Sequence, residues 1–169
     1  MSLDKSSLKS RYILYAFIAS VTYLVPTSYF LLGNGESKMW LPYLGNFLFF
    51  ISIIVSIAFF NSEANQHANI KSLILTGLRT TFIAAIFSTL VTFIFAAIKY
   101  GYFEMKIGDI EQTAQSATGN SVIYNHNQAG VVIIINALIV NFMMGILGSL
   151  IGASVSKRNQ TTEGGRELI

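Results

Sequence analysis

The chain has no cysteine, two prolines, one tryptophan and few charged residues in its 169 positions. Without cysteine it forms neither a disulfide bond nor a thiolate metal site. Charged residues make up 11% of the sequence and hydrophobic residues 53%, whereas an average globular protein has roughly 25% charged residues. This composition excludes an ordinary soluble domain.

Basic clusters and catalytic motifs are also lacking. The net charge is +3, but the lysines and arginines lie at the edges of apolar segments and do not form the basic stripe that nucleic-acid binding needs. The sequence has no HExxH pattern, P-loop, dinucleotide fingerprint or G-x-S-x-G motif. We therefore expect no nucleic-acid partner, no catalytic, metal-binding or cofactor-binding residues, and no enzymatic activity.

Four apolar stretches are long enough to cross a membrane as helices, at about 12–32, 41–60, 73–98 and 131–155. A helix of roughly 20 residues spans a hydrocarbon core of about 30 Å. The first stretch is longer than the apolar region of a cleaved signal peptide, so we expect it to be retained. The sequence predicts an all-α fold, a polytopic transmembrane bundle of four helices between an N-terminal tail (1–11) and a C-terminal tail (156–169).

The basic residues next to these stretches predict the orientation of the bundle. Cytoplasmic flanks of membrane helices carry an excess of lysine and arginine. One side carries eight such residues, namely Lys5, Lys9, Arg11, Lys71, Arg79, Lys157, Arg158 and Arg166, and the other carries three, namely Lys38, Lys99 and Lys106. We therefore expect both termini in the cytoplasm.

The long outer segment, residues 99–129, contains a short amphipathic pattern. Phe103, Ile107, Ile110 and Ala114 recur at the spacing of one helical face. This pattern predicts a short interfacial helix on the outer membrane surface. Such a helix is also a candidate docking surface for a protein partner.

Small and weakly polar residues form stripes at helical spacing in two of the four stretches. Lipid supplies little hydrophobic driving force between helices, so close packing and hydrogen bonds hold such bundles together. The fourth stretch presents Ala137, Asn141, Gly145, Gly148 and Gly152, and the third presents Gly77, Thr81, Ala85, Ser88, Thr92 and Ala96. We expect the two stripes to face each other, or the fourth-span stripe to face a second copy of the chain.

Four residues are candidates for a role beyond packing. Asn141 is expected to hydrogen-bond to a serine or threonine of the third span, or else to line a pathway, while Asn136 is expected on a different face of the helix. Pro26 interrupts the first span and predicts a kink, either structural or a gating hinge. Arg79 is expected to anchor the third span at the headgroups, or else to contact a substrate or a lipid phosphate.

The layout resembles a family of small four-span bacterial membrane proteins that is known only as a domain of unknown function. The resemblance rests on chain length, on span spacing, on the entry to the third span (71–79) and on the Gly152-Ala153-Ser154 end of the last span. It implies a location in the bacterial inner membrane. It implies no activity and no functional residues.

Three functions remain open on the sequence. The first is a non-enzymatic accessory, structural or self-associating membrane component, with membrane lipids and a homo-oligomer or larger membrane complex as partners. The alternative is a small transporter or passive pore, without proton coupling because the spans lack an embedded glutamate. The least favoured is an enzyme acting on lipid, for which only scattered polar residues in the outer segment are available.

Overall fold

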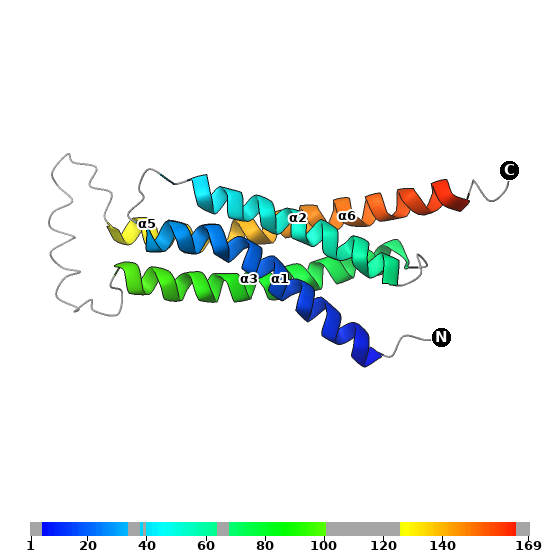
Figure 1. The fold of residues 1–169 in the computed structure, drawn as a ribbon, viewed down its shortest axis with the longest axis horizontal. Helices are drawn as coiled ribbons and strands as arrows, with labels where there is room; N and C mark the ends of the chain where they lie inside the picture. The colour runs from blue at the N-terminus through cyan, green and yellow to red at the C-terminus, as the bar shows by residue number, and fades with distance from the viewer. Residues whose placement is uncertain (1–4, 34–37, 39, 64–67, 101–125, 165–169) are drawn as a thin grey trace.

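The computed structural model of the chain describes residues 5–33, 38, 40–63, 68–100 and 126–164. They form helices α1 (Lys5–Leu32), α2 (Trp40–Glu63), α3 (Ile70–Tyr100) and α5 (His126–Ile135), a five-residue π-helical turn η3 (Asn136–Val140), and α6 (Asn141–Gly164). Figure 1 shows α5 and α6 joined into one continuous rod. The predicted all-α class, with four long helices, is confirmed.

Each of the four rods is long and apolar enough to cross a membrane. The candidate spans are Arg11–Leu32, Trp40–Glu63, Ile70–Lys99 and Gly130–Lys157. Large apolar side chains also cover the outside of the bundle, including Val25, Phe47, Leu90 and Met143, each more than half exposed. A soluble monomer rarely exposes so much continuous apolar surface. The chain is therefore an integral membrane protein.

The rods run alternately up and down around one axis. α1 packs against α2 and α3, and α6 packs against the same two helices, so α1 and α6 lie diagonally across the bundle. In Figure 1 the N-terminal end of α1 and the C-terminal end of α6 lie at the same end of the bundle. Which side of the membrane this end faces stays a prediction.

The helices extend beyond the apolar stretches from which they were predicted. α1 begins at Lys5 within the predicted tail, α2 ends at Glu63, α3 begins at Ile70, and α6 continues to Gly164. Backbone hydrogen bonds continue into polar flanks because a helix does not have to end where the hydrocarbon core ends. The predicted interfacial helix at 103–114 lies outside the described residues.

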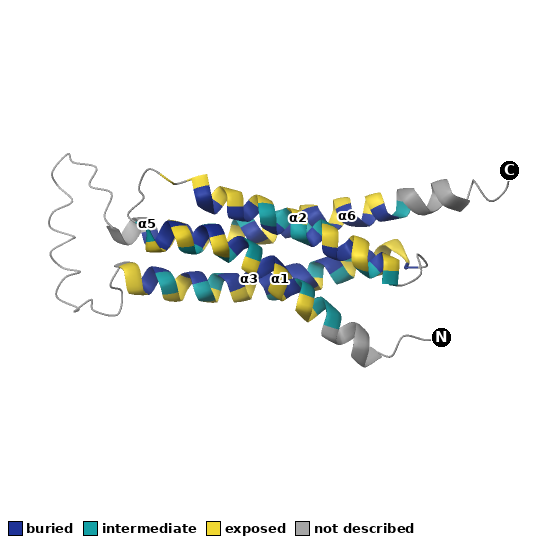
Figure 2. Cartoon of the chain, viewed as in Figure 1, coloured by how far each residue is buried: buried dark blue, intermediate teal, exposed yellow. Residues whose placement is uncertain are grey.

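Buried residues face the axis of the bundle, as Figure 2 shows. α2 contributes the large buried apolar side chains Phe49, Ile53 and Ile57, whereas the other rods place mostly small residues around them. This combination lets the backbones approach closely, which is the main source of stability between helices in lipid.

Candidate functional site

The stripes of the third and fourth spans meet along the N-terminal half of α6. A Cβ atom added at Gly145 would collide with Thr81, lying 2.8 Å from the Cβ of that residue, and one added at Gly77 would lie 2.8 Å from the Cβ of Ser149. Nearby, the side-chain amide of Asn141 donates a hydrogen bond of 3.5 Å to the hydroxyl oxygen of Ser88. These contacts fix the separation of α3 and α6.

The glycines further along α6 face a different helix from the predicted one. A Cβ at Gly148 would lie 3.1 Å from the backbone oxygen of Phe50, and one at Gly152 would lie 3.2 Å from the Cα of Ile54. Both glycines therefore pack against α2. The single predicted seam is in fact two seams, because one face of α6 is wide enough to contact both neighbours. Ala85, Ser88, Thr92 and Ala96 of the third-span stripe are all buried.

The π-helical turn η3 changes which side chains of the fourth span point inward. An α-helix stacks residues about four apart, whereas a π turn bonds residue i to residue i+5. Asn136 and Asn141 therefore lie over one another, and both enter the interior. Asn136 is partly buried and Asn141 fully buried. The expectation that Asn136 lies on a different face assumed an uninterrupted α-helix; in the fold the two residues bond to different helices, Asn136 to Asn46 of α2 and Asn141 to Ser88 of α3.

Asn136 belongs to a group of side chains that we call the polar cluster. The group includes residues of all four rods, namely Tyr23, Thr27, Asn46, Thr92 and Asn136. The amide of Asn46 donates a 3.1 Å hydrogen bond to the side-chain oxygen of Asn136. The hydroxyl oxygen of Tyr23 lies beside the side chains of Thr27, Thr92 and Asn136.

Close packing of α1 on α2 encloses one side of the polar cluster. A Cβ atom at Gly45 would lie 2.9 Å from the backbone oxygen of Tyr23 and 3.1 Å from the hydroxyl oxygen of Thr27. The absence of a side chain at Gly45 therefore brings Asn46, the next residue, close to α1. Tyr23 and Thr27 have no exposed surface at all.

Tyr23 lies close enough to Thr27, Thr92 and Asn136 to hydrogen-bond with them, but several atoms of the polar cluster complete no hydrogen bond of good geometry. The buried atoms without a hydrogen-bond partner include the hydroxyl oxygens of Tyr23, Thr27 and Thr92, Oδ1 of Asn46 and Nδ2 of Asn136. An unsatisfied buried polar group costs about 1–3 kcal/mol, and no bulk water reaches the interior of a membrane to relieve that cost. A hydrogen-bonding molecule that entered the cluster would therefore be bound favourably.

The polar cluster lies well inside the bundle and nearer to one of its ends. Asn46 is about 9 Å along the helix axis from Trp40, the first residue of α2. Asn136 is likewise about 9 Å from Gly130, where the fourth span begins. The cluster therefore lies between the headgroups at this end of the bundle and the middle of the membrane.

Sequence reasoning missed three members of this cluster. Asn46 was available as a signal, since it is a strongly polar residue in an otherwise apolar stretch. Tyr23 and Thr27 gave no signal, because tyrosine and threonine are common on lipid-facing surfaces as well. Pro26 is buried between them within α1, which changes direction near its middle in Figure 1. The hinge role of Pro26 stays a prediction.

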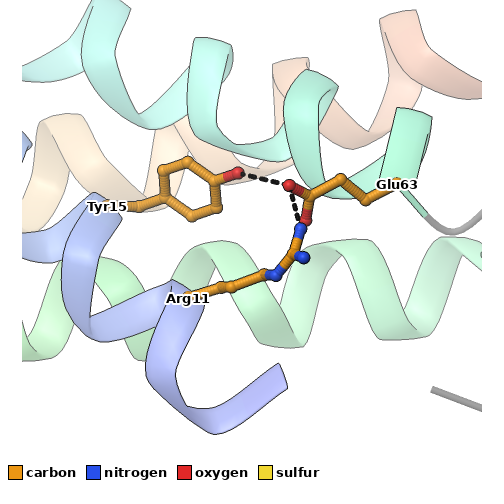
Figure 3. Close-up of polar contacts among 3 residues, drawn as sticks. All are labelled: Arg11, Tyr15 and Glu63. Carbon is orange, nitrogen blue, oxygen red and sulfur yellow. Dashed lines mark hydrogen bonds and ion pairs between the residues drawn. The ribbon is translucent and has the colours of Figure 1, made fainter. Parts of the chain in front are cut away.

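An ion pair joins α1 and α2 at the opposite end of the bundle. Arg11 and Glu63 form a salt bridge, and the hydroxyl of Tyr15 donates a 3.4 Å hydrogen bond to the same carboxylate oxygen, Oε1 of Glu63 (Figure 3). From the sequence alone, Arg11 was predicted only to help orient the bundle in the membrane. We interpret the pair as a structural contact, because it connects α1 and α2 near their ends.

Replacing Glu63 with glutamine is expected to lower the free energy of unfolding by no more than about 1 kcal/mol, because both members of the pair are partly exposed. Denaturant unfolding in detergent would measure the loss, and Tyr15→Phe is the milder companion variant. The difference between wild type and Glu63→Gln should shrink as salt is added, since salt screens exposed charges. A loss above about 3 kcal/mol would show instead that the pair behaves as a buried one.

Arg79 is exposed on α3, far from the polar cluster, and it lines an open groove with residues of α1 and α6. Within the described ranges, no group of three or more histidine, aspartate or glutamate side chains is placed to hold a metal ion. The polar cluster is thus the described site best suited to bind a ligand inside the bundle.

No family model matches this chain, and no curated protein or solved structure matches it either. The resemblance to the four-span bacterial family therefore stays a prediction. The class of protein follows from the fold alone, as a four-helix integral membrane protein with a polar interior.

Proposed function

We propose that this protein is a non-enzymatic small transporter or passive pore, and that the polar cluster binds a small uncharged solute. The observation behind the proposal is the set of unpartnered polar atoms, contributed by all four rods, in the interior of the bundle. Polar residues inside membrane bundles are expensive to place there and commonly mark pathways.

The chemistry of the polar cluster favours an uncharged solute. Its unpartnered groups include an acceptor on Asn46, a donor on Asn136 and hydroxyls that serve as both. None of its members is charged, so a cation would meet donor hydrogens and an anion would meet acceptor oxygens. A small molecule with several hydroxyl or amide groups satisfies both kinds of partner.

Passive movement is favoured over proton coupling. Among the described parts of the spans, the one carboxylate is Glu63, which lies at the end of α2 and is paired with Arg11. Among the residues that the structure describes, no carboxylate therefore lies near the polar cluster to take up and release a proton during transport.

The accessory or self-associating role stays a prediction. It was supported by the stripes of small residues, by the absence of buried charges and by the outer amphipathic segment, and one expectation was that the fourth-span stripe faces a second copy of the chain. Gly145, Gly148 and Gly152 instead pack against α3 and α2 within one molecule, so the stripe no longer favours self-association over transport.

Solute flux into proteoliposomes tests the proposal. Purified protein in uncharged lipid vesicles is expected to speed the entry of glycerol or urea over empty vesicles, measured by stopped-flow light scattering, while potassium entry stays at the background rate. Entry of neither solute above background would overturn transport of this solute class.

A matched pair of substitutions tests whether the solute passes through the polar cluster. Thr92→Val removes a hydroxyl of the polar cluster without changing the size of the side chain, and Thr89→Val removes an unpartnered hydroxyl outside the cluster on the same helix. Loss of one hydrogen bond to the solute is expected to reduce its entry by up to about tenfold in Thr92→Val, with wild-type entry in Thr89→Val. Equal entry in the two variants would place the pathway elsewhere.

A further inference from the structure

The outer surface of the bundle contains a groove that shares no residue with the polar cluster. It has a volume of about 450 Å³ and is lined by Tyr12 of α1, by Leu78, Arg79, Phe82 and Ile83 of α3, and by Phe142 of α6. Four of these six residues are purely apolar. Arg79 and Tyr12 supply its polar groups.

Arg79 has no protein partner in this groove among the residues that the structure describes. Its side chain is exposed, and it makes no hydrogen bond or ion pair with any other residue that the structure describes. A guanidinium is always charged and presents five donors in a planar fork. Arg79 lies about 14 Å along α3 from Ile70, where the third span begins. It lines the groove together with Tyr12, and a long arginine side chain within a span reaches toward the headgroup level, where an anion stabilises it.

The groove extends from the edge of the membrane toward its middle. Tyr12 is next to Arg11, where the first span begins, and therefore lies at headgroup level. Phe142 follows Asn141 near the middle of the fourth span, which extends from Gly130 to Lys157. A charged group thus lies at one end of the groove and aromatic surface at the other.

We propose that this groove binds one anionic phospholipid, with its phosphate against Arg79 and Tyr12 and an acyl chain along Phe82, Ile83 and Phe142. The planar guanidinium of Arg79 binds the phosphate by charge-assisted hydrogen bonds, and the apolar residues of the groove pack against the acyl chain. The ligand is argued from charge complementarity and from the lipid that already surrounds this face of the bundle.

The headgroup contact is tested by lipid binding to purified protein in an uncharged detergent. Native mass spectrometry would measure the affinity for phosphatidylglycerol in wild type, Arg79→Gln and Lys71→Gln. Lys71 is an exposed cation on the same helix that does not line the groove. Loss of a charge-assisted contact is expected to weaken binding on the order of tenfold in Arg79→Gln alone. Equal losses in the two variants would show unspecific attraction and overturn the site.

Three further measurements identify the source of the anion and the role of the acyl chain of the lipid. Phosphatidylcholine is expected to bind more weakly than phosphatidylglycerol, and inorganic phosphate should not compete at millimolar concentration. Competition by phosphate alone would make this a site for a free anion and overturn the lipid proposal. Phe142→Ala is expected to weaken phosphatidylglycerol binding, whereas Met143→Ala, the adjacent exposed residue outside the groove, is not. Circular dichroism of each variant verifies that the fold is intact.

Discussion

Deleting Ile139 is expected to leave the protein folded, although it removes a residue from the middle of a membrane span. Ile139 lies in the π turn η3 and is more than half exposed to lipid. The turn holds one residue more than an α-helical turn, because its hydrogen bonds join residues i and i+5 instead of i and i+4. Removing one residue converts η3 into ordinary α-helix while α5 and α6 keep their relative orientation.

Deletion of Leu147 is the matched control, since Leu147 is also about half exposed but lies in the regular helix α6. Its loss would rotate the residues before it by about 100° relative to those after it. Gly145 and Asn141 would then turn away from α3, and the variant is expected to unfold or fail to accumulate. Circular dichroism and thermal unfolding in detergent measure both outcomes.

A cross-linking experiment verifies the geometry of the shortened helix. The chain has no cysteine, so a cysteine pair at Asn46 and Asn136 would contain its only thiols. A short thiol-reactive reagent is expected to join this pair equally well with and without Ile139. If the pair were joined in the full-length protein but not after the deletion, α5 and α6 would not have kept their relative orientation in the shortened helix.

Substituting Gly145 with alanine is expected to lower the free energy of unfolding by about 1–3 kcal/mol, the usual range for overpacking a close contact. The new methyl group would collide with the side chain of Thr81. The two residues hold α3 and α6 together, so the helices would have to separate. Leu90→Ala, a change on the lipid-facing side of α3, is expected to have a much smaller effect.

A double-mutant cycle isolates this contact. Thr81→Ala removes the atoms that collide and leaves only a Cβ at 2.8 Å, which a small shift can accommodate. The hydroxyl of Thr81 has no hydrogen-bond partner, so the cost of Thr81→Ala alone is expected to come from the buried methyl group that it also removes. The double variant is expected to regain part of the lost stability, with a coupling energy of about 0.5–3 kcal/mol. Strict additivity of the two changes would contradict the contact.

The spans were predictable because their signal is local. Length and the absence of charge define a membrane helix before any tertiary contact forms. The inner faces of α3 and α6 were also readable, since small residues recur at helical spacing and the bulky residues between them, such as Phe82 and Phe142, are exposed. What a stripe faces is not a local property, which is why Gly148 and Gly152 were assigned to the wrong neighbour.

The polar cluster depends on features that a regular helical period does not contain. Asn136 points inward because η3 departs from the α-helical repeat, and Asn46 meets it across 90 residues of sequence. The pairing of Arg11 with Glu63 is similarly non-local. Nothing in a single sequence relates such positions before the rods are packed side by side.

Lys99 shows the same limit at the scale of one residue. In the sequence analysis, Lys99 was only one of the positive charges counted to predict the orientation. In the fold, its ammonium group donates hydrogen bonds to the backbone oxygens of Phe30 and Gly33, at 3.4 and 3.0 Å. Carbonyls at the end of a helix lack partners within that helix, and a nearby cation stabilises them. The end of α3 therefore stabilises the end of α1.

The position of the polar cluster near one end makes the two halves of the membrane barrier unequal. A solute arriving from the end at Trp40 would cross about 9 Å of helix to reach Asn46, whereas from the end at Glu63 it would cross about 25 Å. The longer half contains the close contacts of Gly145 with the side chain of Thr81 and of Gly148 and Gly152 with the backbone and side chains of α2. Binding would therefore equilibrate quickly with one water phase only. The slow step of transport would be the opening of the glycine seams toward the other phase.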